Sequence, residues 1–380
     1  MVSKEGRNVT QTTPNQADHA KWLGAAQDQP EKGFWYEPPI ESGLIPDFVI
    51  RAAIRKMLKG RLKEEDRDSE DANRAAKLAF VEEMKRSPIA LRTDSANAQH
   101  YEVPAEFFKI VLGPRRKYSS AYYPNACKSL AEAEEVMLRL TCERAQLVDG
   151  QDILELGCGW GSLTLYMAEH FPNSRITGVS NSASQRESIL ASATARGLKN
   201  VTILTADMNS FAAAATFDRI VSVEMFEHMR NWELLLAKIS GWLKPDGKMF
   251  LHIFTHSRFA YSFEVRDDSD WMAQHFFTGG MMPSDDLPFY FDRDLRVVEH
   301  WRELGTHYQE TSEAWLANMD ANRARLMPLL AKTYGRENAK KWWSRWRIFF
   351  IACAELWGYR NGKEWLVSHY LLEKQTSGSR

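Results

Sequence analysis

Residues 153–161 read Ile-Leu-Glu-Leu-Gly-Cys-Gly-Trp-Gly, and this stretch decides the fold. The apolar residues within 153–156 suit a strand that is buried on both faces of a parallel sheet. Gly157, Gly159 and Gly161 then allow the backbone to approach a ligand where a side chain would collide. We therefore predict a buried strand that runs directly into a nucleotide-binding loop.

Glu155 is the acidic residue of this strand, and a carboxylate just before the loop is well placed to receive an ammonium group. S-adenosyl-L-methionine carries such a group in its methionyl part, whereas dinucleotides do not. A dinucleotide loop requires G-x-G-x-x-G and an acid about 20 residues further on. Here Ser162 replaces the third glycine, and the next expected strand, 174–179, ends in Ser180 and Asn181. The motif favours S-adenosylmethionine, with a purely structural turn as the alternative.

The composition excludes several classes of protein. The chain of 380 residues has 49 basic and 50 acidic residues, so no broad attraction to nucleic acid or anionic lipid is expected. It has no run of about 18 apolar residues, and its first 30 residues lack a basic-then-apolar signal pattern, which favours the cytoplasm. The four cysteines are scattered without a C-x-x-C pair, which argues against disulfides and a zinc site. We expect no metal.

Helical and strand-like segments alternate from about residue 130 onward. We expect helices at 130–147, 161–170, 183–196 and 231–243, and strands at 152–156, 174–179, 200–204, 217–223 and 247–253. Such alternation predicts an α/β fold, a Rossmann-like parallel sheet covered by helices on both sides. A Pro- and Gly-containing turn at 244–247 leads into the last of these strands.

This pattern divides the chain into four predicted segments. They are a disordered leader at 1–30, a helical N-terminal cap at 31–128, a cofactor-binding core at 129–254, and a region at 255–380 that holds a substrate-covering insertion, the last strands and an aromatic-rich helical lid. The sequence does not indicate an oligomeric state.

Two helices with unusual faces flank the predicted core. The first is basic and amphipathic, with Arg51, Arg55, Lys56, Lys59, Arg61 and Lys63. It could lie on a membrane surface, but a solvated helix face is favoured because acid-rich residues follow at once. The second presents Trp342, Trp343, Trp346, Phe349 and Phe350 along one face. Core packing explains that stripe better than ligand binding does.

A second motif, Ser-Val-Glu-Met-Phe-Glu-His-Met at 222–229, follows a predicted strand. Ligands of open α/β sheets bind outside the carboxyl ends of the strands, so this segment and the glycine loop should face one crevice. If the turn is helical, Glu224 shares a face with Glu227 and His228. Two carboxylates beside an imidazole form a proton acceptor. The alternative is that these are surface charges at a helix N-terminus.

These residue types suit methyl transfer to an amine. The sulfonium of the donor is already activated, so the protein has to align the nucleophile and exclude water. An ammonium with a pKa of about 10 must first lose a proton, and a histidine with a pKa of about 6.5 is a suitable acceptor. Carboxylates attract the cationic substrate, and the aromatic region can add cation–π contacts.

Further cofactor contacts are expected after the next two strands. Asp207 and the adjacent Met208 follow the strand at 200–204, where Asp207 is placed to accept from the adenine amino group. Asn181 and Gln185 can hold the ribose hydroxyls in place of the missing acid. Each assignment depends on the order of these residues after the glycine loop.

The chain resembles the cyclopropane fatty acid synthase superfamily of S-adenosylmethionine-dependent methyltransferases, and within it the coclaurine N-methyltransferase group of benzylisoquinoline alkaloid pathways. The resemblance covers roughly residues 40–374. It is carried by the segments at 99–104, 118–123, 155–161, 180–185, 224–228, 279–283, 357–359 and 364–365. It implies the class I methyltransferase fold.

The resemblance also implies roles for individual residues. Tyr118 and Ser119 should contact the methionyl part of the cofactor, and Asn181 and Gln185 its ribose. In the N-methyltransferases, the residues that match Glu224, Glu227 and His228 handle the amine.

Two departures separate the amine branch from the lipid branch of this superfamily. Lipid-modifying members resemble Tyr-Ser-Cys-Ala-Tyr, where the cysteine helps to hold a bicarbonate base, but here Ser120 occupies that place. They also usually carry glycine in place of Glu224. A second carboxylate suits a cationic nucleophile and is costly beside an alkene. Glu227, His252 and Tyr308 nevertheless match positions around the bicarbonate.

We therefore expect an N-methyltransferase that acts on a small amine, an aromatic alkylamine or a tetrahydroisoquinoline. A lipid enzyme that modifies unsaturated phospholipid acyl chains is the runner-up, and a non-catalytic cofactor-binding protein is a third class. Cys353 matches a cysteine of the lipid enzymes, but on an apolar helix face it is expected to be packed rather than nucleophilic.

Overall fold

The computed structural model describes residues 37–91, 104–263, 276 and 279–375. The chain divides into two units, Met1–Glu37 and Pro38–Arg380, and the fold below belongs to the second. The predicted leader at 1–30 and motif residues 99–103 lie outside the described residues. The predicted segment boundaries at 128 and 254 remain predictions.

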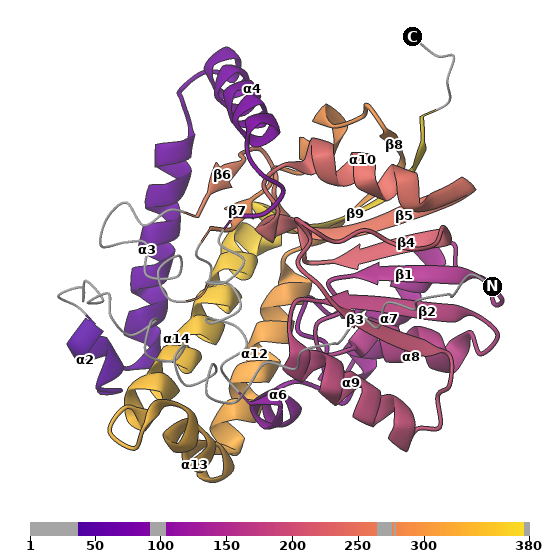
Figure 1. Cartoon of the computed structure of the whole chain (residues 1–380). Helices are drawn as coiled ribbons and strands as arrows, with labels where there is room; N and C mark the ends of the chain where they lie inside the picture. The colour runs from indigo at the N-terminus through magenta and orange to yellow at the C-terminus, as the bar shows by residue number, and fades with distance from the viewer. Residues whose placement is uncertain (1–36, 92–103, 264–275, 277–278, 376–380) are drawn as a thin grey trace, which may run out of the picture. The chain divides into compact units, whose positions relative to one another are not determined.

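The core is a seven-stranded sheet with the order β3-β2-β1-β4-β5-β9-β8 (Figure 1). Its strands are β1 (Asp152–Leu156), β2 (Arg175–Ser180), β3 (Val201–Thr205), β4 (Phe217–Val223), β5 (Leu243–His256), β8 (Leu295–Leu304) and β9 (Trp365–Lys374). The first five are parallel, and β9 is antiparallel to β5 and β8. The strand order reverses between β1 and β4, which is where such sheets bind ligands.

Helices cover both faces of this sheet, as the alternation predicted. They are α7 (Leu130–Arg144), α8 (Ser162–His170), α9 (Ala183–Ala195) and α10 (Trp232–Trp242). Ile153 of β1 packs with residues of α7 and α8, whereas the next residue, Leu154, packs with residues of α10. Figure 1 accordingly shows α10 on one side of the sheet and α8 and α9 on the other. The predicted α/β class is confirmed.

The predicted core elements agree with the observed ones to within a few residues, with one difference at β5. That strand begins at Leu243, so the expected turn at 244–247 lies inside it. Phe217 pairs with Leu243, and Arg219 pairs with Lys248, so the four residues between have no matched partners in β4 and form a bulge. A Cβ on Gly247 would lie 2.9 Å from the Phe217 carbonyl oxygen, which explains the glycine there.

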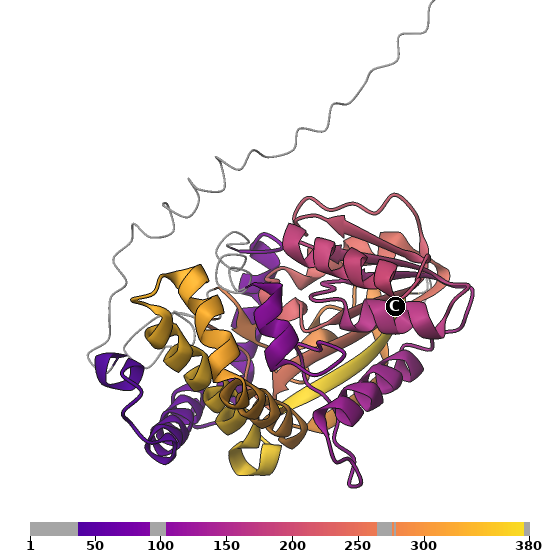
Figure 2. The same cartoon turned by 90° about the horizontal axis from the view of Figure 1, so that it is seen from below.

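The remaining elements precede, interrupt or follow those of the core. They are α2 (Glu37–Glu41), α3 (Asp47–Glu65), α4 (Glu70–Arg86), α6 (Ala105–Val111), α12 (Thr306–Ala321), α13 (Arg323–Tyr334), α14 (Ala339–Gly358), three 3-10 helices, η1 (Phe226–His228), η2 (Leu287–Tyr290) and η3 (Tyr359–Gly362), and the pair β6 (Tyr261–Ser262) and β7 (Met281–Met282). Figures 1 and 2 both place α12 and α14 beyond the carboxyl ends of the parallel strands.

The basic helix predicted near residue 50 is α3, and part of its basic face pairs with acids of the fold. The Arg51 guanidinium contacts Glu313 of α12 at 2.5 Å and Glu355 of α14 at 3.0 Å, and Arg55 also pairs with Glu355 at 2.7 Å. These two arginines therefore attach α3 to the C-terminal helices. The sequence could not show this because the carboxylates lie about 300 residues away.

Four of the five residues in the aromatic stripe of α14 are core, as predicted, whereas Trp342 is half-buried and stacks on Tyr334. Trp346 and Phe350 are fully buried, and Trp343 and Phe349 nearly so. The Trp346 ring lies 4.9 Å from the ring of Phe107 in α6. Such aromatic pairs stabilise the packing of α14 against the N-terminal helices.

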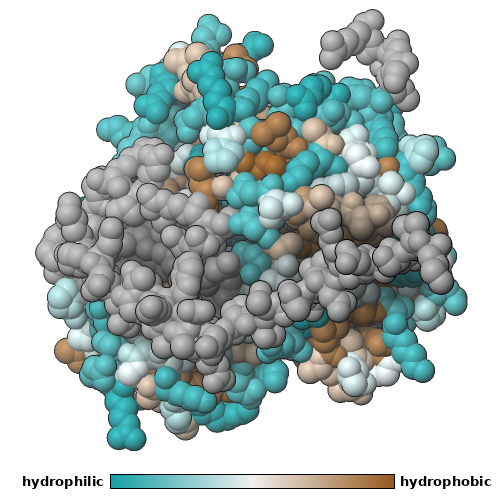
Figure 3. All heavy atoms as spheres, viewed as in Figure 1, coloured by the Kyte–Doolittle hydropathy of each residue, from teal (hydrophilic) through white to brown (hydrophobic). Residues whose placement is uncertain are grey.

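None of the described helices is long and apolar enough to cross a membrane. On the face in Figure 3, hydrophilic side chains cover much of the described surface, and hydrophobic ones gather in separate groups.

Candidate active site

The glycine loop lies against the acidic segment that follows β4. Gly157 has a positive φ of 79°, and a Cβ on it would lie 2.8 Å from the Cβ of Met225. Gly161, with a φ of 81°, would bring a Cβ to 2.7 Å from Ile189 of α9. Gly159 has open space around its Cα. The predicted meeting of the two motifs at one edge of the sheet is confirmed.

Glu155 is buried beside this loop without an ion-pair partner among the described residues. Its side chain is 3% exposed and accepts a hydrogen bond from the Thr164 hydroxyl of α8. Burial raises the pKa of the Glu155 carboxyl to about 7, although the nearby Lys117 opposes this shift. A carboxyl in this state gains from a ligand cation, so its chemistry fits the ammonium end of S-adenosylmethionine.

The residues predicted to hold the ribose and adenine follow β2 and β3 at the same edge. Gln185 is buried, and its Oε1 accepts from the Ser180 hydroxyl at 2.7 Å, whereas Asn181 is exposed. Asp207 is partly exposed and accepts a hydrogen bond from a backbone amide two residues on; Met208 is buried. Their contacts to the cofactor remain predictions.

Tyr118 and Ser119 lie in the segment between α6 and α7, and the structure adds a neighbour that sequence reasoning missed. Lys117 is 3% exposed, and its ammonium donates to the Ser119 hydroxyl. Burial lowers the pKa of Lys117 to about 8, while Glu224, Glu134 and Glu155 raise it. A buried cation therefore stands between the cofactor segment and the acidic segment. No spacing rule marks it in the sequence.

Glu224 is the hub of hydrogen bonds in this site. It has a positive φ of 49°, and its side chain is 9% exposed. Its Oε1 accepts from the Ser120 amide at 2.9 Å, and its Oε2 accepts from the Tyr308 hydroxyl at 2.7 Å. The His252 ring nitrogen Nε2 lies 3.3 Å from Oε1. Three of the predicted residues, Glu224, His252 and Tyr308, are thus brought together from the position just after β4, from β5 and from α12.

A chain of buried groups continues from Glu224 to the edge of the sheet. His252 and His369 face each other across β5 and β9, with Nδ1 of the first 2.9 Å from Nε2 of the second. The guanidinium of Arg144 in α7 lies 2.6 Å from Nδ1 of His369 and 2.6 Å from a carboxylate oxygen of Glu303 in β8.

Arg144 determines the tautomers of both histidines. A guanidinium only donates, so Nδ1 of His369 must accept, and its Nε2 must carry the proton. That proton is donated to Nδ1 of His252, whose own proton is therefore on Nε2 and points at Glu224. Burial also lowers the pKa of both rings well below the usual value, so both are neutral. The neutral His252 is a fixed donor to Glu224.

Glu224 does not share a helical face with Glu227 and His228. Glu224 itself has a left-handed backbone conformation and lies before the short 3-10 turn η1. Glu227 is buried, and its Oε1 accepts from the Phe254 amide at 2.7 Å, while its buried Oε2 has no hydrogen-bond partner among the described residues. Burial, reinforced by Glu224, raises the pKa of Glu227 well above its usual value.

His228 is partly buried at the end of this turn. Burial lowers the pKa of its imidazole, although Glu224 acts in the opposite direction. The three predicted groups therefore do influence one another. Burial thus raises the pKa of both carboxyls and lowers that of the imidazole, which suits groups that exchange protons.

The fold and this site define a class I S-adenosylmethionine-dependent methyltransferase. The model of the mycolic acid cyclopropane synthetase family matches residues 90–363. The chain belongs to that family and, more broadly, to the cyclopropane fatty acid synthase superfamily.

Similar N-methyltransferases place the chain further. The (S)-coclaurine N-methyltransferase of Thalictrum flavum subsp. glaucum is 41% identical over 340 residues, which cover 88% of this chain and 94% of that protein. The pavine N-methyltransferase of the same plant is 36% identical over 339 residues, which cover 88% of this chain and 95% of that protein. A crystal structure of coclaurine N-methyltransferase bound to N-methylheliamine and S-adenosylhomocysteine superposes with a TM-score of 0.87 at 40% sequence identity. The match covers 89% of this chain and 98% of the chain in that structure.

Proposed function

We propose that this enzyme methylates the nitrogen of a small amine of the benzylisoquinoline type. The observation that supports the proposal is the close approach of Gly157 in the glycine loop to Met225 in the segment at 224–228, because this loop is expected to hold the methyl donor and this segment the amine. The similarity to coclaurine and pavine N-methyltransferases supports the substrate class.

The protonation states of the site suit a cationic substrate. Glu224 accepts from Ser120, His252 and Tyr308, and these donors stabilise its ionised form. Burial raises the pKa of Glu224, but the buried cation Lys117 opposes that shift. The carboxylate therefore attracts an ammonium, which has a pKa of about 10 in the free amine.

His228 is the group that we assign as the base. Its lowered pKa keeps the imidazole neutral near pH 7, so it can accept the proton that leaves the substrate nitrogen. S-adenosylmethionine, when bound, supplies an activated methyl group on a sulfonium. The unpartnered Oε2 of Glu227 is a second polar group for the substrate nitrogen. Burial raises the pKa of its carboxyl, and a cationic amine beside it would favour the ionised form.

A substrate panel tests the proposal. Transfer of labelled methyl to tetrahydroisoquinolines and aromatic alkylamines is measured by mass shift, with unsaturated phospholipid vesicles as the competing substrate. We expect methylated amine, and roughly 10²-fold less turnover in a His228→Ala variant that still binds S-adenosylhomocysteine. Methylation or cyclopropanation of acyl chains with no activity on any amine would overturn the proposal.

We further propose that the enzyme works in the cytoplasm on a small molecule, without nucleic acid and without a required membrane contact. All four cysteines are unpaired, which fits a reducing compartment. The ion pairs of Arg51 and Arg55 with Glu355 leave less free positive charge on α3 for a lipid surface.

A further inference from the structure

A second polar site lies behind the cofactor segment, where residues 113–117 turn between α6 and α7. The carboxylate of Glu134 in α7 holds this turn, because it accepts from the Arg115 amide at 2.8 Å and from the Lys117 amide at 3.2 Å. A Cβ on Gly113 would collide with the same carboxylate at 2.4 Å. The turn is therefore fixed, and it aims the side chains of two consecutive arginines in set directions.

The two arginines have opposite electrostatic surroundings. Arg115 is neutralised, since its guanidinium contacts Glu135 and lies 2.5 Å from Glu169. Arg116 is 8% exposed and has a positive φ of 54°, yet no described carboxylate lies within ion-pair distance of it.

The guanidinium of Arg116 has only neutral partners. It donates to the Ser188 hydroxyl at 3.1 Å and to the Ser192 hydroxyl at 2.7 Å, both in α9, which uses two of its five N–H donors. Burying a charge without a counter-charge is costly. Burial lowers the pKa of Arg116, and repulsion from the nearby cation Arg196 lowers it further. An anion would relieve both costs.

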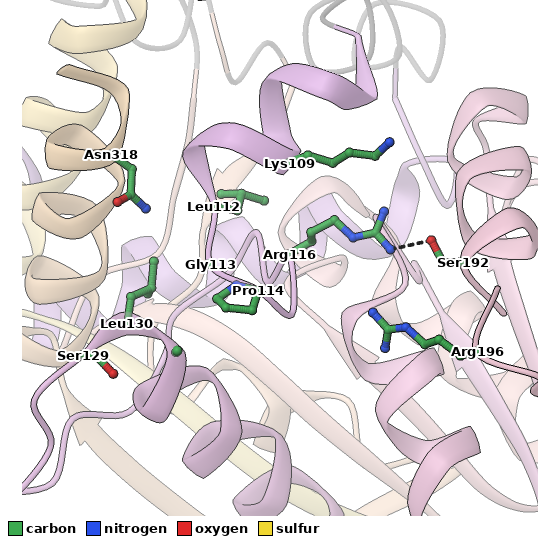
Figure 4. A pocket seen from close by; sticks show the side chains of 11 residues that line it. Lys109, Leu112, Gly113, Pro114, Arg116, Ser129, Leu130, Ser192, Arg196 and Asn318 are labelled. Carbon is green, nitrogen blue, oxygen red and sulfur yellow. Dashed lines mark hydrogen bonds between the residues drawn. The ribbon is translucent and has the colours of Figure 1, made fainter. Parts of the chain in front are cut away.

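A pocket of about 610 Å³ opens at this place (Figure 4). Its charged lining residues are all basic, Lys109 of α6, Arg116 and Arg196, and its polar ones include Ser192 and Asn318. Lys109 and Arg196 are exposed, and each also pairs with a glutamate outside the pocket lining. Arg116, the buried cation, has no such partner among the described residues.

We propose that this pocket binds a multivalent oxyanion, the phosphate group of a phosphorylated small molecule. Guanidinium groups recognise phosphate through charge-assisted hydrogen bonds, and the remaining Arg116 donors are available for them. The volume lies in the range of small-molecule sites, about 300–1,000 Å³, so there is room for more than a bare ion.

The site is also connected to the cofactor. Arg116 precedes Lys117 and Ser119 in the segment beside the methyl donor, and its serine partners lie in α9, which begins next to the predicted ribose contacts. An anion that orders Arg116 would stabilise the position of this segment against α9.

The proposal is tested by calorimetric titration of the full chain with pyrophosphate, inorganic phosphate and a phosphate monoester. Each titration is made at constant ionic strength, with chloride as the blank. We expect binding in the wild type and a dissociation constant about tenfold or more higher for Arg116→Gln, the loss expected for a charged hydrogen bond. Lys109→Gln, which leaves Arg116 and its serine partners in place, should weaken binding about threefold. The control is Arg175→Gln, which removes an exposed cation of β2 and should change nothing.

The outcomes separate the alternatives. No binding by the wild type at about 10 mM of any probe, or equal affinity in the wild type and both pocket variants, refutes the site. Equal weakening in Arg175→Gln also refutes it, because it indicates general attraction to a charged surface. Tighter binding of the monoester than of inorganic phosphate identifies an esterified ligand, and equal binding identifies free phosphate.

Discussion

Replacing Arg144 by methionine should impair catalysis although the residue lies on α7, outside the reacting groups. The guanidinium is a donor only, and it fixes the proton of His369 on Nε2 and that of His252 on the nitrogen that faces Glu224. Without it, His369 can carry its proton on Nδ1. The ring of His252 can then turn a lone pair toward the Glu224 carboxylate at 3.3 Å.

The size of the effect follows from the bond that is lost. A hydrogen bond to a charged group contributes roughly 1.5–3 kcal/mol, so kcat/KM should fall about 10- to 100-fold. The pKa of Glu224 should rise as it loses a donor, so the acidic limb of the pH profile of kcat/KM should move to higher pH.

The matched control is Glu303→Gln. It removes the ion pair at 2.6 Å but leaves Arg144 as the donor to His369, so kinetics should stay near wild type. Arg144→Lys, another donor-only side chain, should restore part of the activity. Steady-state kinetics between about pH 5 and 9, with thermal unfolding to confirm folding, make the comparison. Equal losses in Arg144→Met and Glu303→Gln, with an unshifted pH profile, would refute the tautomer argument.

Three further outcomes are expected. Gly161→Ala should lower the free energy of unfolding by about 2–4 kcal/mol in urea titrations, because a left-handed φ is combined with a clash against Ile189. The control is Gly197→Ala, at a φ of 70° with open space around it, which should lower the free energy of unfolding by only about 1–2 kcal/mol. Glu155→Gln should weaken S-adenosylmethionine binding about tenfold or more in calorimetry, since it removes the charge and keeps an oxygen for Thr164; unchanged affinity would contradict the ammonium assignment. Because the pKa of His228 is lowered, its neutral form persists below pH 6.5, so kcat should begin to fall only below that pH, and a fall that begins above it counts against His228 as the base.

The sequence predicted the parts of this enzyme that depend on local pattern. The alternating segments located the parallel strands, and the glycine spacing located the loop, because both are set by neighbours within a few residues. A 3-10 turn does follow β4, but the shared face considered for Glu224, Glu227 and His228 fails because Glu224 itself has a left-handed backbone. No pattern rule could have anticipated that conformation for a glutamate.

The long-range contacts were beyond such reasoning. His369 meets His252 across 117 positions of the chain, and Arg144 meets His369 across 225. Lys117 is surrounded by carboxylates from three separate elements. Each contact forms only when the sheet order brings β9 beside β5 and the segment before α7 beside β4.

The left-handed conformation of Glu224 also determines how freely this position can be exchanged. A φ of 49° is unusual for a glutamate and ordinary for glycine. A Glu224→Gly exchange therefore needs no rebuilding of β4 or of the turn after it. It relieves the backbone strain at this position and removes the oxygens that accept from Ser120, His252 and Tyr308.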